Sequence, residues 1–113
     1  MPRAFPALIV LALAAACSDS KRELGQARTS RSVLAEWALL AEMNGTLPGT
    51  YARQMRDEAR SELDATAAAA RRSPSPNSAA ILALAEVKGD PPAAALRARV
   101  RRAQALEQRL EAR

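Results

Sequence analysis

The sequence contains no histidine and only one cysteine, Cys17, among its 113 residues. Histidine is the commonest general base and metal ligand in proteins, so its absence argues against imidazole catalysis and against most zinc sites. A single cysteine cannot form an intrachain disulfide. The chain also has no glycine-rich phosphate loop, no metal-ligand spacing and no nucleophile motif. We therefore expect no enzyme activity, no metal site and no cofactor.

Aromatic residues are scarce as well, at 3% of the chain, and β-branched residues are few. Alanine, leucine, arginine and glutamate dominate instead, and these are among the best helix formers. The composition therefore predicts an all-α protein. Large apolar side chains are so few that their burial roughly balances the entropy lost on ordering the chain. We expect a marginally stable monomer or a fold completed by self-association or a partner.

The first apolar segment, residues 4–16, carries no charge and follows Met1 and Arg3. It is shorter than the roughly 20 residues that a membrane-spanning helix needs. The segment ends in three alanines directly before Cys17, and polar residues follow at once. A weakly basic start, an apolar middle and small residues at the end are typical of a secretion signal.

The string Leu13-Ala14-Ala15-Ala16-Cys17 resembles the lipobox of bacterial lipoproteins, although Ala14 stands where leucine is usual. The resemblance covers this segment alone. It implies cleavage before Cys17, a diacylglycerol on the cysteine sulfur and an acyl chain such as palmitate on its nitrogen. Two or three acyl chains on one protein give stable membrane anchoring. Ser18 after the cysteine favours a location in the outer membrane, facing the periplasm. Asp19, one position later, leaves a location in the inner membrane as an alternative.

Two other interpretations of this segment stay open. An ordinary cleaved signal would leave a soluble secreted or periplasmic protein with a free cysteine. An uncleaved short anchor or a buried N-terminal helix would keep residues 1–16 in the mature chain.

Turn-forming residues divide the rest of the chain. We expect a signal peptide at 1–16, a flexible lipidated tether at 17–31 and a helical domain at 32–113. Within that domain, helices are expected at 32–43, from residue 48 or 50 to 72, from residue 76 or 78 to 88, and from residue 91 to near 113. Asn44-Gly45, the serine- and proline-rich run 73–77 and Gly89 separate them. Short connections favour antiparallel neighbours, so we expect a small up-and-down bundle of about four helices or an open pair of helical hairpins.

Helical spacing places Trp37 on an apolar stripe of the first expected helix. We expect it to anchor the core, with Tyr51 packed nearby; an exposed contact for a partner is the alternative. Further stripes run along the second and last helices, through Tyr51, Met55, Ala59, Leu63 and Ala67, and through Leu96, Val100, Ala103, Leu106 and Leu110.

The most unusual cluster is Arg97, Arg99, Arg101 and Arg102, within a segment that carries six basic and two acidic residues at 93–113. On a helix, Arg97 and Arg101 share one side, and Arg99 and Arg102 share another. One interpretation is a binding face for an anionic envelope partner, such as phospholipid head groups, lipid A phosphates or an acidic protein surface. The other is a solubilising face near a helix C-terminus. Nucleic acid is not expected, because no aromatic residues alternate with the arginines.

These features together predict a small membrane-anchored envelope lipoprotein that acts as a non-catalytic binding or structural module. The alternative is a soluble secreted or periplasmic helical protein, or a small-ligand carrier. A carrier needs a roomy apolar cavity, which so few large side chains can hardly enclose. Covalent attachment to peptidoglycan through a C-terminal lysine is not expected, because the chain ends at Arg113.

Overall fold

The computed structural model describes the backbone of residues 4–43 and 45–112, and the side chains of residues 19–43 and 45–112. Within these ranges the chain forms four helices and no strand. They are α1 (Ala4–Glu42), α2 (Gly49–Arg72), α3 (Ser78–Ala85) and α4 (Ala93–Glu111). The prediction of an all-α fold with about four helices is confirmed.

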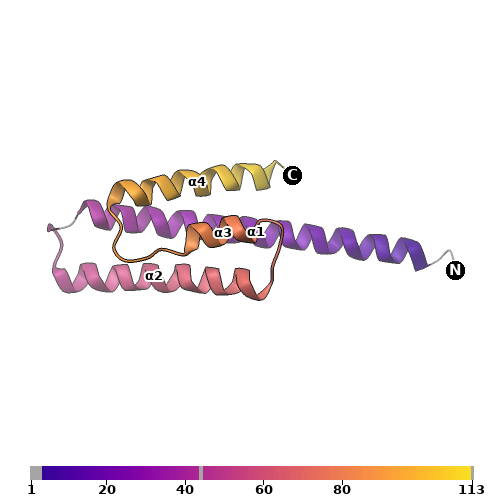
Figure 1. Cartoon of the computed structure of the whole chain (residues 1–113), viewed down its shortest axis with the longest axis horizontal. Coiled ribbons are helices and arrows are strands. Elements are labelled where there is room, and N and C mark those ends of the chain that lie inside the picture. Colours follow the sequence, from indigo (N-terminus) through magenta and orange to yellow (C-terminus); the bar gives the residue numbers. More distant parts are fainter. Residues whose placement is uncertain (1–3, 44, 113) are drawn as a thin grey trace.

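The long helix α1 forms the spine of the bundle, and α2 and α4 run antiparallel to it on either side (Figure 1). Three ion pairs set the register of α1 against α4. Arg28 Nη2 lies 3.1 Å from Glu111 Oε1, Arg31 Nε lies 2.8 Å from Glu107 Oε1, and Glu42 pairs with Arg97. The short helix α3 contacts all three other helices.

The connections between helices use the turn residues that the sequence indicated. Gly45 and Gly89 have φ values of +88° and +65°, in the left-handed region that glycine adopts without a Cβ penalty. Helix α4 begins at Ala93 rather than at Pro91, and α3 ends at Ala85, before the expected residue 88. The residue before a proline avoids the helical region, so Pro91, which precedes Pro92, cannot easily start a helix.

The core lies along the face of α1 that the other helices cover. Trp37 is 1% exposed, which confirms its expected place in the core. The stripe of α4 is buried at Leu96, Ala103, Leu106 and Leu110, and the stripe of α2 at Ala59, Leu63 and Ala67. Many of the buried side chains are alanines, and their small size lets helix backbones approach closely.

The prediction of a flexible tether at 17–31 is wrong for residues 19–31, because these residues belong to α1 and pack against the bundle. Glu23, Ala27 and Ser30 are each at most 1% exposed. Their spacing places them on the same helix face as Leu34 and Trp37. Because these residues are polar or small, the sequence alone did not mark them as a packing surface.

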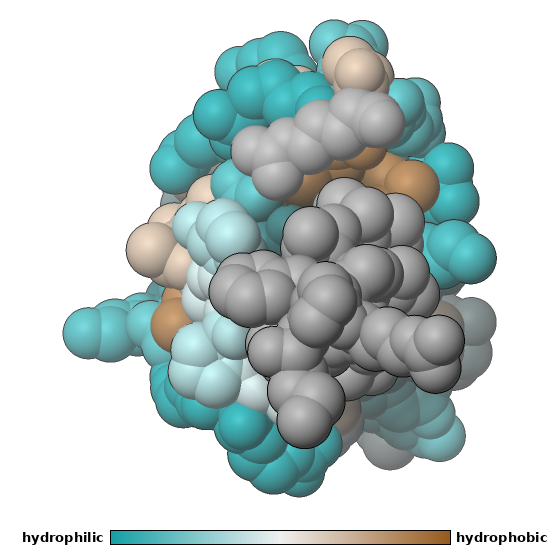
Figure 2. Space-filling model, turned by 90° about the vertical axis from the view of Figure 1, so that its right-hand side faces the viewer, coloured by the Kyte–Doolittle hydropathy of each residue, from teal (hydrophilic) through white to brown (hydrophobic). Residues whose placement is uncertain are grey.

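The end of the bundle from which the N-terminal part of α1 continues also holds the C-terminal ends of α2 and α4 (Figure 1). Figure 2 views the molecule from this end, and most of the described residues at its periphery are hydrophilic. The side chains of residues 1–18, including the thiol of Cys17, lie outside the described residues.

Candidate functional site

A surface hollow lies at the opposite end of the bundle, where the end of α1, the start of α2 and the connection between α3 and α4 meet. Its apolar lining includes Trp37, Leu40, Leu47, Pro91 and Pro92. The charged residues Arg53, Arg56 and Asp90 also line it. Trp37 is almost completely covered, so it contributes to the floor of the hollow and not to its rim.

One wall of this hollow is the α3–α4 connection, which two arginines of α2 hold in place. Arg60 Nη1 donates a hydrogen bond to the Val87 carbonyl at 2.9 Å, and Arg60 Nη2 donates to the Gly89 carbonyl. The Arg60 guanidinium carbon also lies 5.0 Å from the centroid of the Trp37 ring. Arg56 Nη1 lies 3.5 Å from Asp90 Oδ1. The connection is therefore fastened to α2 by charge-assisted contacts.

Tyr51 was expected to pack near Trp37 with its hydroxyl at the edge, and its side chain is 50% exposed. The first turn of α2 lies beside the end of α1, and α3 begins farther along the bundle (Figure 1). Leu39 and Met43, near the end of α1, are likewise 58% and 44% exposed. This end of the bundle thus presents apolar and aromatic side chains to solvent.

The four arginines that the sequence singled out do not form one surface. Arg97 pairs with Glu42 of α1. Arg99 Nη1 donates to the carbonyl oxygens of Ala83, Leu84 and Glu86 at 2.7, 3.2 and 3.2 Å, so it satisfies carbonyls at the end of α3.

The remaining two arginines of the cluster, Arg101 and Arg102, are exposed. Neither forms a hydrogen bond or an ion pair with a residue that the structure describes. The cluster is thus divided among a contact to α1, a contact to α3 and two outward guanidinium groups. Arg97 and Arg101 were expected to share one side of the helix, and Arg99 and Arg102 another. In each pair, only the first residue forms a contact within the bundle.

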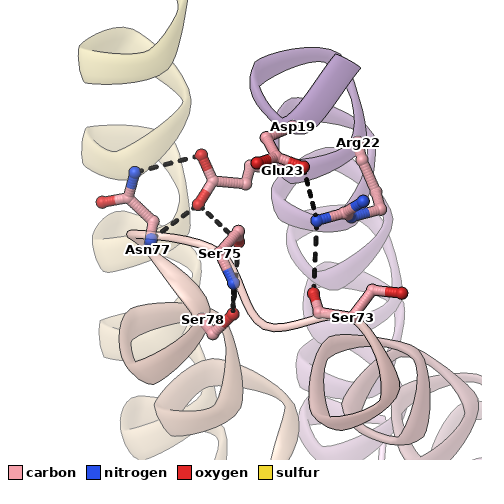
Figure 3. Close-up of polar contacts among 7 residues, drawn as sticks. All are labelled: Asp19, Arg22, Glu23, Ser73, Ser75, Asn77 and Ser78. Atoms are coloured by element: carbon pink, nitrogen blue, oxygen red, sulfur yellow. Dashed lines mark hydrogen bonds and ion pairs between the residues drawn. The ribbon is translucent and has the colours of Figure 1, made fainter. Parts of the chain in front are cut away.

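A polar junction between α1 and the α2–α3 loop was not anticipated from the sequence (Figure 3). The buried carboxylate of Glu23 accepts hydrogen bonds from Ser75 Oγ at 2.8 Å and from the Asn77 backbone N–H at 2.6 Å. Asn77 Nδ2 donates to its other oxygen at 3.2 Å. A buried carboxylate is stable only when such donors satisfy it.

An arginine at the same junction fixes the start of the loop. Arg22 Nη2 donates to the Ser73 carbonyl at 3.2 Å and lies 2.9 Å from Asp19 Oδ1. In Figure 3 these contacts and those of Glu23 hold the loop against α1 from two directions. The polar residues of this serine- and proline-rich loop were a usable signal, but they did not reveal that the partner lay more than fifty residues away.

The described residues contain no group of three or more histidine, cysteine, aspartate or glutamate side chains able to hold a metal ion. Among the described helices, none is long and apolar enough to cross a membrane. Comparison with protein-family models, with curated proteins and with solved structures finds no match to this chain. Function is therefore inferred from the residues and their arrangement.

Proposed function

We propose that this protein is a membrane-anchored lipoprotein of the bacterial cell envelope. A lipid on Cys17 would hold the helical bundle at the periplasmic face of a membrane, where the bundle acts as a non-catalytic binding or structural module. Ser18, directly after the cysteine, supports the outer membrane.

One observation carries this proposal: the segment that resembles a lipobox belongs to the same helix as the centre of the core. Helix α1 runs without a break from Ala4 to Glu42 and includes the position of Cys17. A chain cleaved before Cys17 would begin at the modified residue and enter the bundle within a few helical turns. The lipid would therefore attach to the structural spine of the protein.

The geometry also sets the orientation that such an anchor would impose. The hollow lined by Trp37, Leu40 and Leu47 lies at the end of the bundle opposite the end from which α1 continues (Figure 1). A lipid on Cys17 would leave this end directed away from the bilayer. Arg101 and Arg102 have no described partner, so any contact of the arginine cluster with an anionic partner would use these two residues.

The non-catalytic part of the proposal is supported by how the carboxylates are used. Glu107, Glu86 and Glu42 each pair with an arginine of a different helix. Each of these carboxylates is engaged by a guanidinium group in a contact that holds two parts of the bundle together. These carboxylates connect helices.

The intact mass of the protein purified from membranes tests the anchor. The expected species begins at Cys17 and carries the added mass of a diacylglycerol and an acyl chain. The Cys17→Ala variant, which lacks the sulfur nucleophile, should show neither the cleavage at this site nor the added mass. An unmodified cysteine, in either a full-length or a cleaved chain, would contradict the proposal.

A further inference from the structure

Three exposed basic side chains lie at the end of the bundle from which α1 continues. Lys21 lies on α1, Arg72 in the last turn of α2 and Arg109 in the last turn of α4. The contact of Arg22 with the Ser73 carbonyl places the end of α2 beside this part of α1. Figure 1 shows that the end of α4 lies at the same level. We call Lys21, Arg72 and Arg109 the basic rim.

The basic rim is not neutralised by neighbouring acids. None of its three side chains forms an ion pair with a residue that the structure describes. The acidic residues near the rim are engaged with other partners. Three of them form ion pairs: Asp19 with Arg22, Glu86 with Arg71, and Glu111 with Arg28. The fourth, Glu23, is buried and accepts hydrogen bonds from the α2–α3 loop. Among the residues that the structure describes, this end therefore carries an excess of unpaired positive charge.

Helix geometry brings this rim close to the position of Cys17. Lys21 follows Cys17 by four positions in α1, which corresponds to about 6 Å along the helix axis at 1.5 Å per residue. That distance is below the Debye length of about 10 Å at ordinary ionic strength. A lipid on Cys17 would thus place Lys21 at the depth of phospholipid head groups, with the ends of α2 and α4 at the same end of the bundle.

We propose that the basic rim binds the anionic head groups of the bilayer in which Cys17 is anchored. This inference rests on the proposed function and adds to it a second contact, through charge, between the bundle and the lipid surface. Basic residues in the last turn of a helix are favoured by the helix dipole, which would account for Arg72 and Arg109 without any partner. The helix dipole does not account for Lys21, which lies far from the C-terminus of α1.

The combination of a lipid and a rim of charge has a physical consequence. Acyl chains supply anchoring, and each basic residue near an anionic surface adds attraction that falls off within a Debye length. Because residues 19–31 are helical and packed, the bundle cannot swing freely about a long linker. The rim would therefore hold the bundle upright on the membrane, with the hollow directed outward.

Vesicle partitioning of the full-length Cys17→Ala chain tests the charge contact without the lipid. Binding is compared between phosphatidylcholine vesicles and vesicles containing one-third phosphatidylglycerol. The rim variant replaces Lys21, Arg72 and Arg109 by glutamine. The control replaces Arg53 and Lys88 by glutamine; both are also exposed and lie away from this end, and it is matched to a rim variant that replaces only Lys21 and Arg72 by glutamine.

We expect the rim variant to lose on the order of 100-fold in partitioning to the anionic vesicles, since each basic residue contributes roughly fivefold. Raising the salt concentration should remove the same preference. The control should lose far less than its matched rim variant, and a variant with Arg72→Lys and Arg109→Lys should keep the binding. Equal losses in the control and its matched rim variant, or no loss in the rim variant, would overturn the inference.

The lipidated chain provides an independent measurement of orientation. An introduced cysteine would be the only free thiol, because the chain has one cysteine and its sulfur would carry the lipid. Fluorophores are attached in Ser73→Cys and Thr50→Cys, at opposite ends of α2. In anionic vesicles, head-group quenchers should quench the label at residue 73 more strongly, and the rim substitutions should reduce this difference.

Equal quenching at both positions would contradict the inference. The two proposals fail separately: an unmodified Cys17 refutes the lipid anchor, whereas the absence of a phosphatidylglycerol preference refutes the rim whatever the state of Cys17.

Discussion

The guanidinium group of Arg60 covers the Trp37 ring, with 5.0 Å between the guanidinium carbon and the ring centroid. The same guanidinium donates hydrogen bonds to the carbonyls of Val87 and Gly89. One side chain of α2 therefore connects the core residue of α1 to the α3–α4 connection. A cation over an indole contributes about 0.5–1 kcal/mol at exposed sites and more when water is excluded.

Replacing Trp37 tests the importance of this core contact. Trp37→Ala should reduce the free energy of unfolding by about 3–5 kcal/mol, because a large buried side chain is removed and a cavity remains. In a domain this small, such a loss unfolds much of the population. Trp37→Phe keeps a ring in place and should cost less. Urea unfolding followed by circular dichroism measures both; a stable Trp37→Ala variant would show that Trp37 is not a core anchor.

Arg60 is expected to stabilise the α3–α4 connection through its hydrogen bonds. Arg60→Lys keeps the charge but loses the planar fork that reaches two carbonyls, and should cost about 1–3 kcal/mol. Arg53→Gln, on the exposed surface of the same helix, is the control and should change stability by less than about 0.5 kcal/mol. The readout is the urea midpoint, and equal shifts for the two variants would contradict the assigned role of Arg60.

Arg99 and Arg101 should behave differently although they are only two residues apart. Arg99→Gln removes the donor to three carbonyls at the end of α3 and should cost about 1–2 kcal/mol. Arg101→Gln, at an exposed position without a described partner, should be nearly neutral. Amide hydrogen exchange should show faster exchange in α3 for the first variant only. Unchanged protection of α3 in Arg99→Gln would argue against this helix-end contact.

The buried carboxylate of Glu23 should be needed to hold the α2–α3 loop. Glu23→Ala leaves the Ser75 hydroxyl and the Asn77 backbone N–H without their acceptor, which should cost at least about 2 kcal/mol. The Asn77 amide should then exchange faster with solvent. Glu36→Ala, at an exposed position on the same helix, is the matched control. Similar effects of the two substitutions would show that the junction contributes little.

Two glycine substitutions should have opposite effects on stability, and the first of them tests the helical structure of residues 19–31. Gly25 lies within α1, and a Cβ at this position would have nothing within 4 Å, so Gly25→Ala should raise the free energy of unfolding by about 0.5–1 kcal/mol. Gly45 has a φ of +88°, so Gly45→Ala should lower it by about 1 kcal/mol. A neutral Gly25→Ala would mean that this segment is not helical in solution. Thermal unfolding resolves changes of this size.

The helical stripes could be predicted because they depend on local periodicity. Ala59, Leu63 and Ala67 on α2, and Leu96 and Leu106 on α4, are buried as their spacing indicated. Tyr51 continues the stripe of α2 but is half exposed, because a stripe is buried only where another element covers it. Periodicity identifies the apolar face of a helix and does not reveal where its neighbours end.

The candidate site was harder to predict because its contacts join residues far apart in the chain. Arg99 was expected to belong to either a binding face or a solubilising face, yet its guanidinium satisfies the carbonyls of α3. Glu23 was placed in a tether, yet it is buried against Ser75 and Asn77. Both side chains are polar, and a polar side chain in sequence is equally consistent with solvent and with a distant partner.

By itself the sequence determined the helical class, the turns at Gly45 and Gly89 and the apolar faces of α2 and α4. These follow from backbone propensity and from a spacing of three to four residues, which are local properties. Only the tertiary structure decided which charged residues are engaged within the bundle and which stay exposed. Ion pairs and buried hydrogen bonds depend on which helices become neighbours, and packing of the whole chain sets that arrangement.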